Sequence, residues 1–392
     1  MTHAFAPGSV VFVGAGPGEA DLITLRGAER LRAADVVLFD ALADPALRAL
    51  APNARWIDVG KRGFVGVAHA ARGGRENTAQ ATIDALLVKH ATAGKRVVRL
   101  KGGDPSIFGR LEEELAALAA AGIECEVVPG VTAALAAAAS TRRPLTRRGG
   151  GRSVALTTAV SHDGKLGAGR HADTEVFYMA GKQLAALARK LVDAGWPTST
   201  PALVVSRAGW PDELASEHTV ATLAEATLPG ANARWIDVGK RGFVGVAHAA
   251  RRGRENTAQE TIDALLVKHA AEGKRVVRLK GGDPSIFGRL EEELAALAAA
   301  GIECEVVPGV TAALAAAAST RRPLTRRGGG RSVALTTAVT NDGKLGAAQR
   351  DEVGLAGTGA DEGDAAGRDR VRHAGVSARR RKRGNGLPRA RW

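Results

Sequence analysis

The sequence predicts an α/β fold in which short buried strands alternate with helices. Apolar runs of four or five residues recur between segments of helical periodicity, and glycine-rich turns follow several of the runs. A continuous apolar run is typical of a strand that is covered on both faces. Alternation of such strands with helices implies crossover connections, and therefore a mainly parallel sheet.

The first α/β domain is predicted to span residues 1–129. Apolar runs that end in turns predict its strands at 10–13, 36–39, 55–59, 96–100 and 124–128. Leucine, isoleucine and alanine residues at helical spacing predict the helices between them, near 24–31, 77–93 and 111–121.

A second α/β domain is predicted over residues 130–230, after Pro129-Gly130. An alanine-rich helix at 132–139 opens it. Strands follow near 153–157, 175–178 and 202–205, with a helix at 183–194.

The chain contains one segment twice. Residues 53–168 recur as 232–347 at a constant offset of 179, and six of these 116 positions differ. We call the two segments copy one and copy two. Copy two lacks the first two strands, so residues 231–347 are expected to be a non-functional partial duplicate of 52–168. Where copy two begins, the second domain is expected to lack its last strand and to leave an unpaired edge.

The composition argues against a membrane-spanning, secreted or disulfide-rich protein. The sequence shows no apolar run of about 20 residues and no apolar segment of the signal-peptide kind at its start, so a cytoplasmic protein is expected. Cys125 and Cys304 are the same position in the two copies, which argues against a disulfide framework or a cysteine-based metal site.

The positive charge is concentrated at one end of the chain. Residues 368–392 hold ten Arg or Lys residues and one acid, which gives +9 of the net +14. Residues 348–392 show no hydrophobic period and are predicted to be a disordered basic tail. Such a tail could bind polyanions nonspecifically.

Two glycine-rich segments follow predicted strands. The first, Gly14-x-Gly16-x-Gly18, departs from the G-x-G-x-x-G nucleotide fingerprint in its spacing and by the insertion of Pro17. The second, RLKGGDPSIFGR at 99–110, stands at the carboxyl end of a strand, where open α/β sheets bind ligands. Gly-Gly-Asp-Pro is also a common turn sequence, so a simple turn without a ligand is the alternative interpretation of this segment.

Six motifs in order and spacing resemble the uroporphyrinogen-III C-methyltransferases of the tetrapyrrole methylase family. The motifs are VGAGPG at 13–18, FD at 39–40, VGKR at 59–62, RLKGGDPSIFGR at 99–110, VPGVT at 128–132 and YM at 178–179. The resemblance covers about residues 9–225. It implies a two-domain tetrapyrrole methylase fold, usually a homodimer, with S-adenosyl-L-methionine bound between the domains and S-adenosyl-L-homocysteine as a product.

The resemblance also implies a reaction. Two pyrrole carbons of uroporphyrinogen III would be methylated to give precorrin-2, with no metal required, for either sirohaem or cobalamin biosynthesis. Asp40 matches the family's proton acceptor and Lys61 its proton donor. The matches to the family's cofactor-binding positions are Pro17, Gly102, Gly103, Asp104, Ile107, Thr132, Ala133, Met179 and Ala208.

Arginines are plausible partners for the eight substrate carboxylates, since guanidinium pairs with carboxylate in a bidentate manner. The candidates are Arg62, Arg142, Arg143, Arg147, Arg148 and Arg152. Two alternatives to the methyltransferase remain: an inactive duplication product or cofactor-binding remnant, and, more distantly, a nicotinamide-dependent oxidoreductase.

Overall fold

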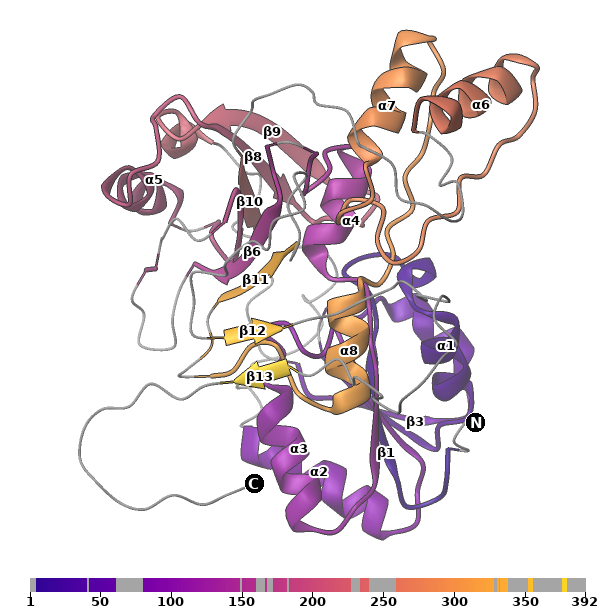
Figure 1. Cartoon of the computed structure of the whole chain (residues 1–392). Helices are drawn as coiled ribbons and strands as arrows, with labels where there is room; N and C mark the ends of the chain where they lie inside the picture. The colour runs from indigo at the N-terminus through magenta and orange to yellow at the C-terminus, as the bar shows by residue number, and fades with distance from the viewer. Residues whose placement is uncertain are drawn as a thin grey trace, which may run out of the picture.

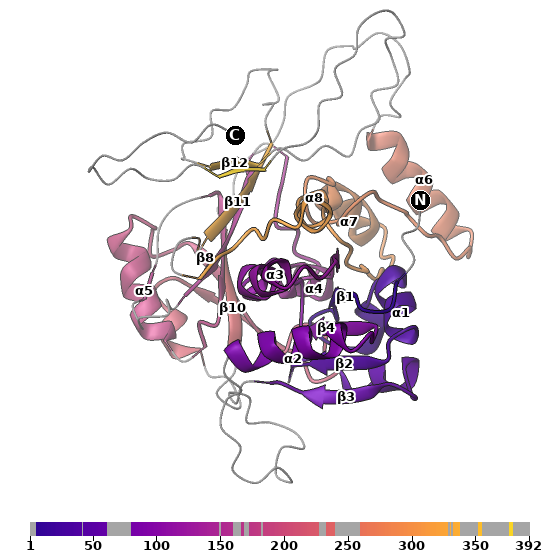
Figure 2. The same cartoon turned by 90° about the horizontal axis from the view of Figure 1, so that it is seen from below.

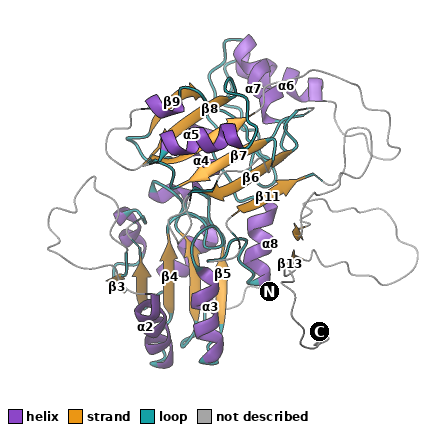
Figure 3. Cartoon of the chain, turned by 90° about the vertical axis from the view of Figure 1, so that its left-hand side faces the viewer, coloured by secondary structure: helices purple, strands orange, loops and turns teal. Residues whose placement is uncertain are grey.

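The computed structural model contains two main β-sheets, one above the other in Figure 3, with helices packed on their faces. The residues that the structure describes are 5–40, 42–60, 80–148, 150–159, 166–167, 172–181, 183–226, 233–239, 259–327, 330, 332–337, 352–354 and 376–378.

The apolar runs of the first domain form a five-stranded sheet in the order β3-β2-β4-β1-β5, and each pairing in it is parallel. β1 and β4 are buried along their whole length, as parallel strands with both faces covered must be. The predicted fold class is confirmed. The strands are β1 (Val10–Gly14), β2 (Val36–Phe39), β3 (Arg55–Asp58), β4 (Val97–Lys101) and β5 (Cys125–Val128).

Helices cover both faces of this sheet (Figures 1 and 2). Successive side chains of a strand point to opposite faces, so Phe12 packs with α2 and α3, whereas Val13 packs with α1. The helical elements are η1 (Ala20–Leu22), α1 (Leu25–Arg32), η2 (Pro45–Leu50), α2 (Gln80–Thr92) and α3 (Leu111–Ala120).

The second sheet has six strands in the order β11-β6-β7-β10-β8-β9, and only its β6–β7 pair is parallel. Helix α4 (Ala133–Ser140) leads into this sheet, α5 (Leu184–Asp193) packs on it, and η3 (Leu223–Glu225) follows β9 in the chain. The strands from copy one and the residues just after it are β6 (Ser153–Thr158), β7 (Thr174–Tyr178), β8 (Pro201–Ser206) and β9 (Leu214–Thr219).

The two remaining strands of the second sheet come from copy two. They are β10 (Ala233–Gly239) and β11 (Ser332–Thr336). β10 lies antiparallel between β7 and β8, so the start of copy two fills a place inside the sheet of the second domain. The same RWID sequence forms the parallel edge strand β3 in copy one.

Copy two keeps its helices, but its counterparts of β4 and β5 are not strands. Its helices are α6 (Gln259–Ala271), α7 (Leu290–Ala299) and α8 (Ala312–Thr320). Residues 274–280 and 302–310 have no regular secondary structure, and Val277 and Leu279 are 87% and 86% exposed. Their counterparts Val98 and Leu100 are fully buried beside β1, a strand that copy two does not have.

Most of the predicted basic tail lies outside the described residues. Within it, β12 (Glu352–Gly354) and β13 (Val376–Ala378) form an antiparallel pair. Among the described helices, none combines the length and the apolar character that a membrane span requires.

Candidate active site

Three loops at the carboxyl ends of β1, β4 and β5 meet through their glycines. The Gly103 amide donates to the Gly16 carbonyl at 2.7 Å, and the Ala15 amide donates to the Lys101 carbonyl at 2.8 Å. A Cβ atom on Gly14 would lie 2.6 Å from the Gly130 Cα, so a side chain there would collide with backbone. Glycine is therefore required at this contact. β1 and β4 are neighbours whose following connections run in opposite directions, the position at which open α/β sheets bind ligands.

Loops of the second sheet join the same place. The Glu19 amide donates to the Gly209 carbonyl at 2.8 Å, and a Cβ on Gly18 would lie 1.8 Å from that oxygen. The Tyr178 hydroxyl lies 2.8 Å from the Thr132 hydroxyl and accepts from the Ala134 amide. We call the meeting point of these loops, which follow β1, β4, β5, β7 and β8, the loop junction.

Nine predicted cofactor residues all belong to the loop junction. Gly102, Gly103 and Ala133 are partly exposed, and Met179 is 54% exposed with a positive φ of 61°. A non-glycine residue in this conformation is strained, and such strain is common where a ligand binds. The other five are buried: Pro17, Asp104, Ile107, Thr132 and Ala208.

Asp104 connects the β4 loop to the β5 loop. Its Oδ1 accepts from the Ser106 amide and hydroxyl at 2.8 and 2.5 Å, and its Oδ2 accepts from the Gly130 amide at 2.9 Å. The side chain is buried, and burial raises its pKa from 3.8 to about 6 despite these hydrogen bonds. Asp104 therefore already has a structural task, which sequence reasoning about ligand contacts did not find.

The raised pKa of Asp104 predicts a pH effect on stability. The folded state binds the Asp104 proton more tightly than the unfolded state does, so stability from this group is present at low pH and is lost as the pH rises towards 6. In Asp104→Asn the group does not titrate. We expect the difference in unfolding free energy, wild type minus variant, to fall by roughly 2 kcal/mol between about pH 4 and pH 7. Urea unfolding of both proteins across this pH range measures the difference in unfolding free energy. A difference that stays constant or rises with pH would contradict the prediction.

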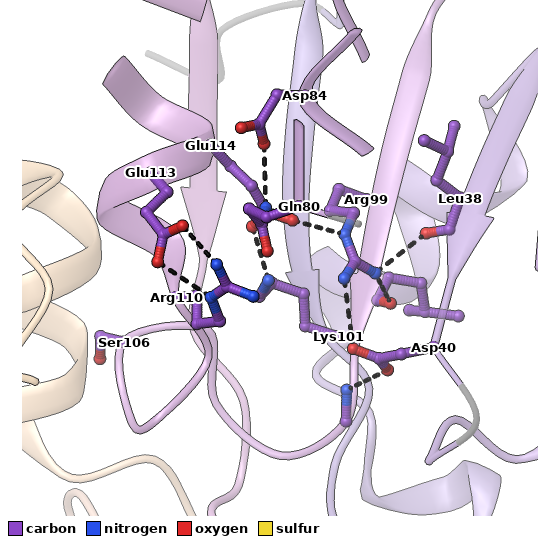
Figure 4. A network of polar contacts seen from close by, with 12 residues as sticks. Leu38, Asp40, Gln80, Asp84, Arg99, Lys101, Ser106, Arg110, Glu113 and Glu114 are labelled. Atoms are coloured by element: carbon purple, nitrogen blue, oxygen red, sulfur yellow. Dashed lines mark hydrogen bonds and ion pairs between the residues drawn. The ribbon is translucent and has the colours of Figure 1, made fainter. Parts of the chain in front are cut away.

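Asp40, the predicted proton acceptor, stands directly after β2 and contacts the loop junction (Figure 4). Its Oδ1 accepts from the Gly102 amide at 3.0 Å, and its Oδ2 lies 3.4 Å from Arg99 Nη2. The Asp40 side chain is 25% exposed. The carboxylate is thus held beside the predicted cofactor loop while part of it stays open to a reactant. Lys61, the predicted proton donor, lies outside the described residues, as does Arg62.

A buried charge cluster of Arg99, Lys101 and Glu114 adjoins Asp40 (Figure 4). Glu114 accepts from Arg99 Nε at 2.8 Å and from Lys101 Nζ at 2.5 Å. Burial opposes the charge on Glu114, but Lys101 and Arg99 outweigh burial and lower its pKa. Arg99 also donates to the carbonyl of Leu100 at 2.9 Å. The cluster therefore orients Arg99 towards Asp40.

The sequence contained a signal for this cluster. Arg99 and Lys101 are two positions apart in a strand that is otherwise apolar, so both point to one buried face and need a shared acid. Glu114 on α3 provides it. The sequence analysis did not single out Glu114.

Some of the arginines predicted to hold substrate carboxylates form ion pairs with acidic residues of the protein. Arg143 pairs with Glu217 of β9, and two others face acids of copy two. These two are Arg147, 3.6 Å from Glu291, and Arg148, 3.8 Å from Glu292. Three of the six candidates are therefore engaged by carboxylates of the protein itself.

The chain is similar in sequence to a protein named as a uroporphyrinogen-III C-methyltransferase and to proteins named as siroheme synthases. A uroporphyrinogen-III C-methyltransferase of Pseudomonas aeruginosa is 42% identical over 205 residues, which cover 51% of this chain and 80% of that protein. A siroheme synthase of Neisseria meningitidis is 40% identical over 272 residues, covering 68% of this chain and 54% of that protein. The chain thus spans about half the length of the siroheme synthases it matches.

A solved structure has a similar fold. The uroporphyrin-III C-methyl transferase of Thermus thermophilus, complexed with S-adenosylhomocysteine, is 35% identical with a TM-score of 0.50, covering 59% of this chain and 97% of that one. A model of the tetrapyrrole (corrin/porphyrin) methylases matches residues 9–227 and again 231–358. Because these two segments include well over half of the residues, the chain belongs to the tetrapyrrole methylase family.

Proposed function

We propose that the chain is an S-adenosylmethionine-dependent C-methyltransferase that converts uroporphyrinogen III to precorrin-2 through residues 9–225. The observation that carries this proposal is the loop junction, where five strand ends from two sheets converge on the residues expected to bind the cofactor. Relatives named for this reaction, and the Thermus thermophilus structure complexed with S-adenosylhomocysteine, support it.

The residues at the loop junction fit such a cofactor. A Cβ on Gly103 would have the Val131 carbonyl at 4.0 Å as its nearest contact, so open space adjoins the backbone there. Gly102, Gly103, Ala133 and Met179 would contact the cofactor directly because they are the partly exposed members. Asp104 and Thr132 would hold the loops in place through Gly130 and Tyr178. When bound, S-adenosylmethionine supplies an electrophilic methyl group on a sulfonium.

The chain's own residues would then orient the reactants and handle protons. Asp40 would accept a proton from the substrate after the pyrrole carbon has gained its methyl group. Its hydrogen bond from the Gly102 amide ties the base to the same loop that holds the cofactor, so the two are positioned together. Lys61 is proposed as the proton donor.

Calorimetry with S-adenosylhomocysteine, together with turnover of uroporphyrinogen III, tests the proposal. We expect one cofactor per chain, because copy two has Gly281, Gly282 and Asp283 but no counterpart of Pro17 or Met179. Absence of binding would overturn the proposal. Binding without turnover would favour the cofactor-binding remnant, and two sites per chain would show that copy two forms a site of its own.

A further inference from the structure

The contacts between copy one and copy two occur in pairs with the roles exchanged. The Phe108 amide donates to Thr325 Oγ1 at 2.6 Å, and at the offset of 179 the Phe287 amide donates to Thr146 Oγ1, also at 2.6 Å. The same exchange relates two salt bridges, each 3.6 Å long. They are Arg147 with Glu291, and Arg326 with Glu112.

The strand pairing follows the same rule. β6 and β11 carry the same SVALT sequence and pair antiparallel, with Ala155 opposite Ala334 at the centre. Because these two alanines are the same position in the two copies, a pseudo-two-fold axis passes between them. Equivalent side chains from both copies also share one hydrophobic cluster, as Ile107 and Ile286 do.

An interface in which residue i contacts j and j contacts i is the isologous kind that two identical subunits form. Here both halves of the interface belong to one chain. The surface of copy one that would face a second copy of this sequence is therefore already covered. Helix α8 extends the covering to the edge of the first sheet, where Ala318 packs into the core beside Val127 (Figures 1 and 3).

The interface reaches the loop junction through Thr325. The Thr325 amide and hydroxyl both donate to the Ser106 carbonyl, at 3.1 and 3.0 Å, in addition to the bond from the Phe108 amide. These bonds hold the β4 loop at the turn where Phe108 has a positive φ of 51°. Thr325 is 4% exposed, so no water competes for these groups.

We propose that copy two serves in cis as the partner subunit of copy one, and that Thr325 is a positioning residue for the cofactor loop. The homodimer expected from the family resemblance is then replaced by a pseudo-dimer within one chain. The role of Thr325 rests on the proposed function, whereas the pairing of the copies does not. Copy two thus contributes to the site without containing one.

Thr325 and Thr146 form a matched pair for the first experiment. They make equivalent contacts, but only Thr325 holds the loop of the complete site. In the full chain we expect Thr325→Val to weaken S-adenosylhomocysteine binding about five- to ten-fold, because valine makes neither of the two hydrogen bonds of the Thr325 hydroxyl to the β4 loop. Thr146→Val should change it less than about two-fold, and Thr325→Ser should restore wild-type affinity. Equal effects of the two valine variants on binding would overturn the positioning role.

The second experiment tests the pairing without the cofactor. Directly opposed residues of antiparallel strands are close enough for a disulfide. In the full chain with Ala155→Cys and Ala334→Cys, mild oxidation followed by peptide mapping should show a disulfide within one chain at low protein concentration. A disulfide between chains, or none, would overturn the cis pairing. If wild-type protein fails to bind S-adenosylhomocysteine while this disulfide forms, the proposed function is wrong and the pseudo-dimer stands.

Discussion

Asp40→Asn should lower the turnover of uroporphyrinogen III by about 100-fold or more, the usual contribution of a positioned general base. Asparagine keeps an oxygen that can accept from the Gly102 amide, so the loop should stay in place while the proton acceptor is lost. We therefore expect affinity for S-adenosylhomocysteine to change by less than about three-fold. Steady-state kinetics and calorimetry on the same samples separate the two effects.

Asp58→Asn is the matched control. Asp58 is the last residue of the neighbouring strand β3, and its carboxylate likewise accepts from a backbone amide, that of Gly60. Turnover by this variant should stay close to that of the wild type. An Asp40→Asn enzyme with more than half of the wild-type rate would show that Asp40 is not the base. Lys61→Met is expected to lower turnover as well, with the cofactor affinity retained.

The second large effect is on stability. It compares the same substitution at equivalent leucines of the two copies, Leu100 and Leu279. Leu100→Ala should lower the free energy of unfolding by about 2–5 kcal/mol, because Leu100 is fully buried among Val13, Val37 and other residues of the first core. Leu279→Ala removes the same atoms from a side chain that is 86% exposed. Its effect should be within about 0.5 kcal/mol of zero.

Amide hydrogen exchange of β1 and β4 provides the measurement, since it reports the opening of this sheet separately from the rest of the chain. A Leu279→Ala effect on this exchange as large as that of Leu100→Ala would mean that residues 274–280 of copy two pack against the first sheet in solution. Equal but small effects would instead mean that the first core tolerates the cavity at Leu100.

The sequence predicted the first sheet well because its signals are local. A run such as residues 10–13, buried on both faces and followed by a glycine turn, has few alternatives to a central strand. Parallel strands also place their carboxyl ends at one edge, so motifs that follow β1, β4 and β5 lie along that edge. The edge positions of Asp40 and Gly102 could therefore be anticipated from strand order alone.

Other parts of the site could not be anticipated, because their partners are far away along the chain. Glu114 meets Lys101 only after α3 has packed on the sheet. Thr325 is 217 positions from the Phe108 amide that it accepts from, and nothing near either residue marks the other. The pairing of Arg147 with Glu291 is likewise decided by how the two copies dock, and no local signal around Arg147 marks it.

The duplication separates what the local sequence determines from what the tertiary structure determines, because the same sequence occurs in two structural environments. Local sequence alone determined the helices, and α3 and α7 have the same bounds in both copies at the offset of 179. The tertiary structure decided the strands: RWID is a parallel edge strand as β3 and part of an antiparallel inner strand as β10. A helix satisfies its backbone hydrogen bonds within itself, whereas a strand exists only beside a partner. Copy two lacks β1, and Leu279 is therefore exposed where Leu100 is buried.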